Sequence, residues 1–213
     1  MYLLLASISA ALLLHLLALA VTAKLCGVNI VEFKFGIGPK ICDVSKVSVR
    51  LIPIAGYVKM IDSRESALKK GEERYAYDHK PKLIRVLIAL SGCVFLFTAA
   101  FIFLGKEAIH IFIGSFSNLL TGAFSPFGSA QEYIESTRTF ILSSTPIVVF
   151  SATAIYVSAY NLFPLPALNG GHALLEIVDL SDEIKRRLSV LGFFANLLML
   201  LSWLSALAAY MWL

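Results

Sequence analysis

Residues 161–172 read Asn-Leu-Phe-Pro-Leu-Pro-Ala-Leu-Asn-Gly-Gly-His, and this stretch decides how the rest of the chain is interpreted. It lies within residues 139–175, which contain no Asp, Glu, Lys or Arg. That length exceeds the roughly 20 apolar residues that cross a bilayer, and the prolines and glycines interrupt it. We therefore expect a membrane helix over 139–163. An irregular segment should follow it, inside the protein or beside a cavity, where freed backbone groups are tolerated.

The composition is that of a membrane protein. Of the 213 residues, 58% are hydrophobic and 15% are charged, and the mean hydropathy is +0.80. Three further stretches lack charged residues and are long enough to span a bilayer. The sequence predicts an all-α polytopic membrane protein with four transmembrane helices, over 1–23, 84–105, 139–163 and 188–212.

The basic residues predict how these helices are oriented. Of 18 Lys and Arg residues, 13 lie between Lys24 and Arg85, and three more lie at 185–187. The positive-inside rule places these two segments in the cytoplasm, so both termini and the 106–138 segment should lie outside it. The net charge of +4 then reflects membrane topology and contact with the lipid bilayer, and nucleic acid is not an expected partner.

Residues 28–60 predict a small membrane-associated β-sheet in the cytoplasmic loop after the first helix. Apolar and polar residues alternate around Phe33 and again around Val49, which is typical of strands with one apolar face. Two interpretations stay open: a plain surface sheet, and an edge strand that pairs with a guest peptide. Residues 108–124 have apolar residues at helical spacing and predict an amphipathic helix in the outer interface.

Four segments resemble motifs of one known family, in the same order along the chain. They are Ala23-Lys-Leu-Cys-Gly-Val28, Phe33-Lys-Phe-Gly-Ile-Gly38, Ile52-Pro-Ile-Ala-Gly-Tyr-Val-Lys-Met60, and 161–172. On these residues the chain resembles the site-2 zinc metalloproteases, especially the bacterial type that cleaves anti-sigma factors in the inner membrane. The resemblance implies a single membrane domain over 1–213. The 106–138 segment is too short for the PDZ domains that this type carries.

The resemblance also identifies the positions that would carry the chemistry. The family's H-E-x-x-H motif places two zinc ligands and a general base on one helical face, and an aspartate supplies the third ligand. Here the first histidine matches His15, the glutamate matches Leu16, the second histidine matches Leu19, and the aspartate matches Asn169. With one ligand of three and no base, we expect a catalytically inactive chain that has lost zinc and has no metal site or other cofactor.

Binding residues are implied by the same resemblance. In the family the broken segment and its asparagine help to grip an extended substrate, which suggests a partner-binding role for Asn161, Pro164, Pro166, Asn169, Gly170 and Gly171. A kink that merely closes the helix bundle is an equal alternative. For His15 the alternatives are an unused buried imidazole, a partner-binding group, and a group in metal or proton chemistry.

The sequence therefore predicts an inactive site-2-protease-like protein of a bacterial inner membrane. It would bind another integral membrane protein, or a single-pass membrane segment, as an adaptor or a subunit of a complex. One alternative is an active zinc protease with atypical ligands such as His15, His172 or a cysteine. Another is a small transport or channel subunit, which would need a polar path through the helices.

Overall fold

Three helices form the centre of the molecule in a computed structural model, which describes residues 2–64, 67–178 and 180–212. They are α1 (Tyr2–Leu25), α2 (Lys82–Leu104) and α5 (Pro146–Asn161). Small residues allow them to approach closely, and the buried cluster between them and α3 (Glu107–Phe124) contains Ala11, Leu96, Ala100, Ala108, Ala154 and Ile155. Small side chains at helix contacts are typical of membrane bundles, where lipid is as apolar as leucine and close packing drives association.

The expected helix over 139–163 is wrong, because two helices occupy this region. Helix α4 covers Ser129–Ser143, and α5 begins at Pro146. Proline fits the first turn of a helix but forces the preceding residue into extended backbone, and Thr145 has φ −72° and ψ 154°. Among the described residues, three helices are long and apolar enough to cross a membrane, namely α1, α2 and residues 183–212 of α7 (Asp182–Trp212). At 16 residues, α5 is apolar but shorter.

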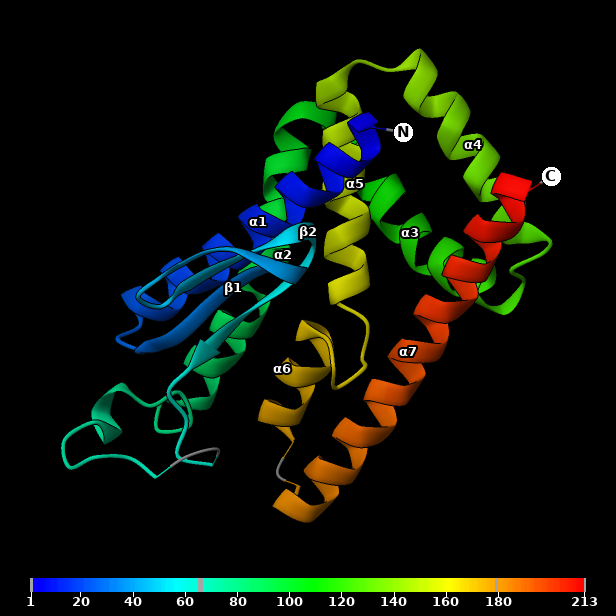
Figure 1. The fold of residues 1–213 in the computed structure, drawn as a ribbon. Helices are drawn as coiled ribbons and strands as arrows, with labels where there is room; N and C mark the ends of the chain where they lie inside the picture. The colour runs from blue at the N-terminus through cyan, green and yellow to red at the C-terminus, as the bar shows by residue number, and fades with distance from the viewer. Residues whose placement is uncertain (1, 65–66, 179, 213) are drawn as a thin grey trace.

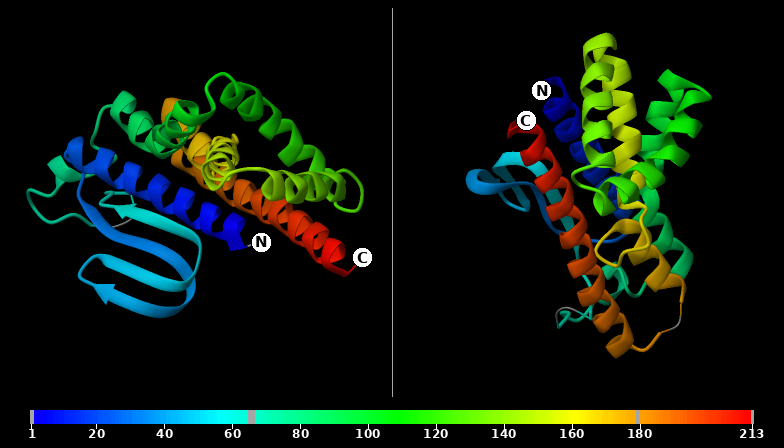
Figure 2. Two further views of the ribbon diagram at one scale, coloured as in Figure 1. Left: turned by 90° about the horizontal axis from the view of Figure 1, so that it is seen from above. Right: turned by 90° about the vertical axis from the view of Figure 1, so that its right-hand side faces the viewer.

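A two-stranded antiparallel sheet follows the first helix, as predicted. Strand β1 covers Ile30–Val44 and β2 covers Val47–Met60. Phe33 pairs with both Val58 and Val47, so β2 folds around β1 and flanks it on both sides. Within the described residues, every ladder partner of the 56–60 stretch belongs to β1, which leaves the other edge of that stretch without a strand. The sheet lies along the outer side of α1 (Figures 1 and 2).

Helix α7 stands apart from α1 on the other side of the molecule (Figure 1). Its polar side chains join it to its neighbours: Tyr160 donates to Asn196 Oδ1 at 2.6 Å, and Trp203 Nε1 donates to the Leu119 carbonyl at 3.0 Å. Gln131 of α4 donates to the Ala206 carbonyl at 2.8 Å. A short helix, α6 (Asn169–Ile177), lies between α2 and the beginning of α7. A loop containing a 3-10 turn (Glu73–Tyr75) joins the sheet to α2.

Candidate functional site

His15 lies at the contact between α1 and α2. Its side chain is buried, with 3% of the residue exposed, and its Nδ1 atom has no hydrogen-bond partner in the described structure. A methyl group on Gly92 would lie 2.5 Å from Nδ1 and 2.7 Å from the His15 carbonyl oxygen. The absence of a side chain at position 92 is therefore what makes room for the imidazole between the two helices.

Leu16, which stands at the general-base position, packs against the sheet. The residue is 6% exposed, and a methyl group on Gly56 of β2 would lie 2.5 Å from its Cδ1 atom and 2.5 Å from the Lys34 carbonyl oxygen. Leu19, one turn further along α1, lines the cavity described below. Leu16 thus packs against the strand, and Leu19 gives the cavity an apolar wall.

Asn169 connects α6 to both α1 and α2. Its Nδ2 group donates to the Ala89 carbonyl at 2.6 Å, and its side chain is a polar neighbour of the His15 imidazole in the lining of one cavity. The structure therefore brings together the two motif positions that carry polar side chains. The amide donates to the carbonyl through its nitrogen and keeps its oxygen as an acceptor, whereas an ionised carboxylate at this position could not donate.

The interrupted segment folds back on itself through its two glycines. A methyl group on Gly170 would lie 2.2 Å from the Leu162 carbonyl oxygen, and one on Gly171 would lie 2.1 Å from the Leu165 carbonyl carbon. Asn161 donates to the Val157 carbonyl of its own helix at 2.8 Å. Asn161 and Pro166 line the cavity, whereas Pro164 is exposed.

A cavity of about 1500 Å³ separates α7 from α1 and the sheet. Residues 54–60 of β2 form one wall, with His15, Leu16 and Leu19 of α1 beside them. The facing surface of α5 carries a polar stripe at helical spacing, made up of Thr153, Tyr156, Tyr160 and Asn161. The cavity is thus mainly apolar, with its polar groups on α5 and at the His15–Asn169 contact.

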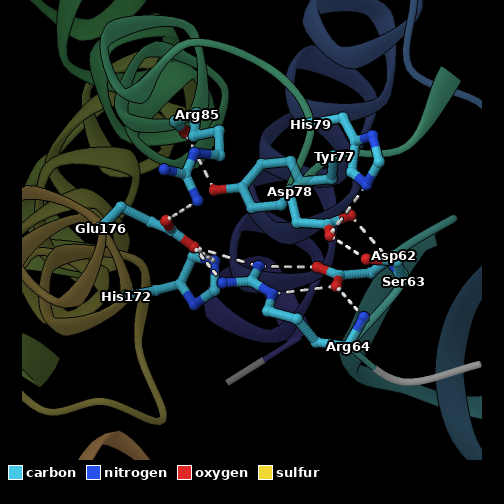
Figure 3. Close-up of polar contacts among 9 residues, drawn as sticks. All are labelled: Asp62, Ser63, Arg64, Tyr77, Asp78, His79, Arg85, His172 and Glu176. Atoms are coloured by element: carbon cyan, nitrogen blue, oxygen red, sulfur yellow. Dashed lines mark hydrogen bonds and ion pairs between the residues drawn. The ribbon is translucent and has the colours of Figure 1, made fainter. Parts of the chain in front are cut away.

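A cluster of charged residues lies at the end of this cavity where Asp62, Tyr77 and His172 form part of the lining. Figure 3 shows these side chains pointing toward one another from three elements. Glu176 of α6 is 4% exposed and pairs with Arg85 of α2, and its Oε1 atom lies 3.2 Å from Arg64 Nη1. Two arginines therefore balance Glu176 and Asp62, which suits a carboxylate that has been removed from water.

The cluster shifts the pKa values of its members. Hydrogen bonding to Asp62 raises the pKa of Arg64 above its ordinary value, and burial raises that of Tyr77. Although 46% of the His172 side-chain surface is exposed, burial among neighbouring atoms lowers its pKa, and the nearby Glu176 only partly opposes this effect. His172 is thus favoured in its neutral form.

Three helices that are long and apolar enough to cross a membrane, a broken segment and a cavity that reaches a buried histidine are features of a membrane-embedded protein. The sequence profile of peptidase family M50 matches residues 3–203, and the chain therefore belongs to this family, the site-2 proteases. The resemblance inferred from the motifs is confirmed.

Individual relatives match over shorter regions. A protein of Neisseria meningitidis named "Putative zinc metalloprotease" is 32% identical over 83 residues, which are 37% of this chain and 19% of that protein. A Clostridium acetobutylicum protein of the same description is 34% identical over 84 residues, or 38% and 24% of the two chains. The "Regulator of sigma E protease" of Haemophilus influenzae is 31% identical over 75 residues, or 33% and 17%. The matched regions thus span about a quarter or less of each relative.

These comparisons contradict two predictions, that the chain is not an enzyme and that zinc has been lost. Family membership and the names of the relatives point to a zinc metalloprotease. The predictions went wrong because they counted donors at the aligned positions only. Zinc needs three or four nitrogen, oxygen or sulfur donors, and a motif count does not test which other residues could supply them.

The side chains at the aligned positions do not fit zinc by themselves. They offer one imidazole and one amide, and the amide nitrogen already donates to Ala89, while the leucines have no lone pair. Within residues 2–64, 67–178 and 180–212, no group of three or more His, Cys, Asp and Glu side chains is placed to hold a metal ion. Of the atypical ligands considered above, His172 belongs to the Glu176 cluster, where its Nε2 atom lies 3.9 Å from Glu176 Oε1.

Sequence reasoning missed the charged cluster. Arg64, Arg85 and Glu176 are far apart in the chain, and only the fold brings them together. One signal was present: Glu176 directly follows the uncharged stretch 139–175, so its carboxylate had to lie close to the membrane-spanning part of the protein.

Proposed function

We propose that this chain binds a membrane-spanning or extended segment of another integral membrane protein in the cavity between α1, β2, α5 and α7. The observation that carries the proposal is the cavity itself, whose volume of about 1500 Å³ exceeds the roughly 300–1,000 Å³ of small-molecule sites. A peptide segment is the ligand class that suits a long, mostly apolar space in a membrane protein.

Two features of the lining support a peptide guest. Among the described residues, the ladder partners of the 56–58 stretch of β2 lie on β1, so the other edge of this stretch offers backbone donors and acceptors for strand addition. The polar stripe on α5 lines the same space, and its hydroxyl and amide groups, which bond within the protein in this structure, can exchange those bonds for bonds to a guest whose backbone is partly unwound. Asn161 and Pro166 border the same space, and the role proposed for the broken segment is to hold the guest at this end.

The proposed location is the plasma membrane of a bacterium, with both termini outside the cytoplasm. The beginning of α1 and the end of α7 lie toward one end of the molecule, and the basic loop before α2 lies toward the other (Figure 1). This arrangement agrees with the orientation that the positive-inside rule gives.

Photo-crosslinking in membranes tests the proposal. A photoreactive amino acid at Leu19, which lines the cavity, should capture a membrane protein, and digestion should place the captured peptide in a hydrophobic segment. The matched control is Leu198 of α7, which is 67% exposed on the outside of the helices and should capture lipid. Equal capture of the same proteins from both positions would contradict a specific cavity site.

The second candidate is proteolysis of the bound segment by the zinc chemistry of the family, which the family match favours. Its test is to equilibrate the purified chain with zinc, remove free ion and measure zinc per chain. Stoichiometric zinc that is lost in His15→Ala, together with cleavage of the captured segment, would establish proteolysis with an unaligned ligand set. Zinc that does not depend on His15 would place the metal elsewhere.

A further inference from the structure

We propose that Glu176 is a positioning residue that couples the end of β2 to the His15–Asn169 contact through α6. The geometric part of this proposal stands alone, while its consequence for guest binding rests on the proposed function. The coupling follows from three sets of contacts: strand to Arg64, Arg64 to Glu176, and α6 to the site.

The end of β2 is fixed to the loop that carries Arg64. The Ile61 amide donates to the Asn29 carbonyl at 2.9 Å, and the Tyr77 amide donates to the Ile61 carbonyl at 2.8 Å. Arg64 then grips Asp62, because its Nε donates to Oδ1 at 2.9 Å and its Nη2 to Oδ2 at 2.6 Å. This bidentate geometry fixes the direction of the guanidinium group relative to the strand.

The same guanidinium holds Glu176. Its Nη1 and Nη2 atoms both lie 3.2 Å from Oε1, and Arg85 pairs with the other carboxylate oxygen (Figure 3). The carboxylate therefore joins an arginine of the loop after β2 to an arginine of α2. Because Glu176 is 4% exposed, water cannot replace a lost partner without movement of α6 or the loop.

Helix α6 transmits this constraint to the site. Asn169 and Glu176 are seven residues apart, which places them on the same side of a helix two turns apart. Their contacts on α2 are Ala89 and Arg85, which are themselves one turn apart. Helix α6 is thus attached to α2 at both ends, and the end that carries Asn169 also meets His15. A displacement of Arg64 should loosen the far end of α6 and with it this contact.

A cysteine at Leu168 reports the position of α6. Leu168 precedes the helix and is 8% exposed, so its thiol should react slowly with a small maleimide in membranes. In a background with Cys26→Ser, Cys42→Ser and Cys93→Ala, we expect Glu176→Gln and Arg64→Gln each to raise the labelling rate roughly tenfold. Arg64→Lys should restore part of the protection, because it keeps the charge.

Glu183→Gln is the matched control. Glu183 also has two arginine partners, Arg186 and Arg187, but its side chain is 50% exposed on α7. This variant should leave the labelling rate unchanged. If the Glu176→Gln protein does not accumulate, Arg64→Gln alone provides the test. The Arg64 side chain is 36% exposed, so its substitution should destabilise the protein less.

Coupling must be reciprocal, which a merely structural role would not require. Hydrogen exchange of residues 56–62 should therefore become faster in Glu176→Gln, although this substitution lies on α6. Unchanged Leu168→Cys labelling in Arg64→Gln, or unchanged exchange at 56–62 in Glu176→Gln, would overturn the proposal. Neither measurement uses a guest. A failure of the proposed coupling is therefore distinguishable from a failure of the proposed binding function.

Discussion

The two polar centres of this molecule, the His15–Asn169 contact and the Glu176 cluster, are held in opposite ways. The first has one imidazole and one amide, enclosed by apolar residues and by glycines that allow close approach. The second has two arginines and two carboxylates whose charges balance. The difference indicates that packing holds the contact between α1, α2 and α6, while charge holds the end of the cavity.

Physical costs explain this division. A charged group at membrane depth is expensive, so uncharged groups are expected at the His15–Asn169 contact, which lies against two helices of membrane-spanning length. Near the membrane surface a buried carboxylate is tolerable when arginines surround it, as they surround Glu176. The predictions below test whether the two centres really depend on packing and on charge, respectively.

The largest effect is expected for Glu176→Gln, because two arginines would lose their buried partner. Breaking a buried ion pair from one side costs about 3–5 kcal/mol, which thermal unfolding in detergent would detect. The exposed pair partner Glu183 provides the comparison, since its change to glutamine should cost at most about 1 kcal/mol. Equal effects of the two substitutions would mean that charge does not hold the cluster.

Gly92→Ala should damage the packed centre. The added methyl group would meet the His15 imidazole at 2.5 Å, and overpacking of this kind costs about 1–3 kcal/mol. Gly114→Ala is the control, because no atom lies within 4 Å of its added methyl group and alanine favours the helix. If thermal unfolding showed that both alanine substitutions stabilise the protein, packing would not be what holds the His15 contact.

Asn169→Asp sharpens the comparison by restoring the family's residue. The change removes the donor to the Ala89 carbonyl and brings a carboxylate next to it, so a loss of about 1–3 kcal/mol of stability is expected. Asn161→Asp is a useful control, since the Asn161 side chain donates to the Val157 carbonyl of its own helix. A stabilising effect of Asn169→Asp would show that this contact is governed by charge after all.

The smallest effect concerns pH. Burial lowers the pKa of His172 in the folded chain, whereas the unfolded imidazole titrates near its ordinary value of about 6.5. Below that pH the unfolded chain binds more protons, so stability should fall as the pH is lowered and stay level above it. The unfolding temperature of His172→Gln, compared with that of the unaltered chain between pH 5 and 8, should lack this component. An identical slope in both proteins would assign the pH dependence to another group.

Much of the fold follows from local patterns in the sequence. The long uncharged stretches predict α1, α2 and the spanning part of α7, and period-two alternation predicts the sheet. The helix expected over 139–163 was wrong because hydrophobicity alone does not report that Pro146 begins a new helix. The Glu176 cluster depends on residues far apart in the chain, such as Arg64 and Glu176, which are 112 positions apart, and a single sequence has no pattern for such a pair. The enzyme and zinc predictions were contradicted for another reason, because ligand identity at three positions does not decide what a family does.

The most direct test of the account is to crosslink from two walls of the cavity, Leu19 on α1 and Tyr160 on α5, and to sequence the captured peptides. A guest that occupies the cavity should yield the same hydrophobic segment from both positions, at residues a few positions apart. Ala152→Trp, which fills the cavity from α5, should reduce both products. Capture of lipid alone, or of unrelated segments from the two walls, would contradict the proposal that this cavity binds a segment of another membrane protein.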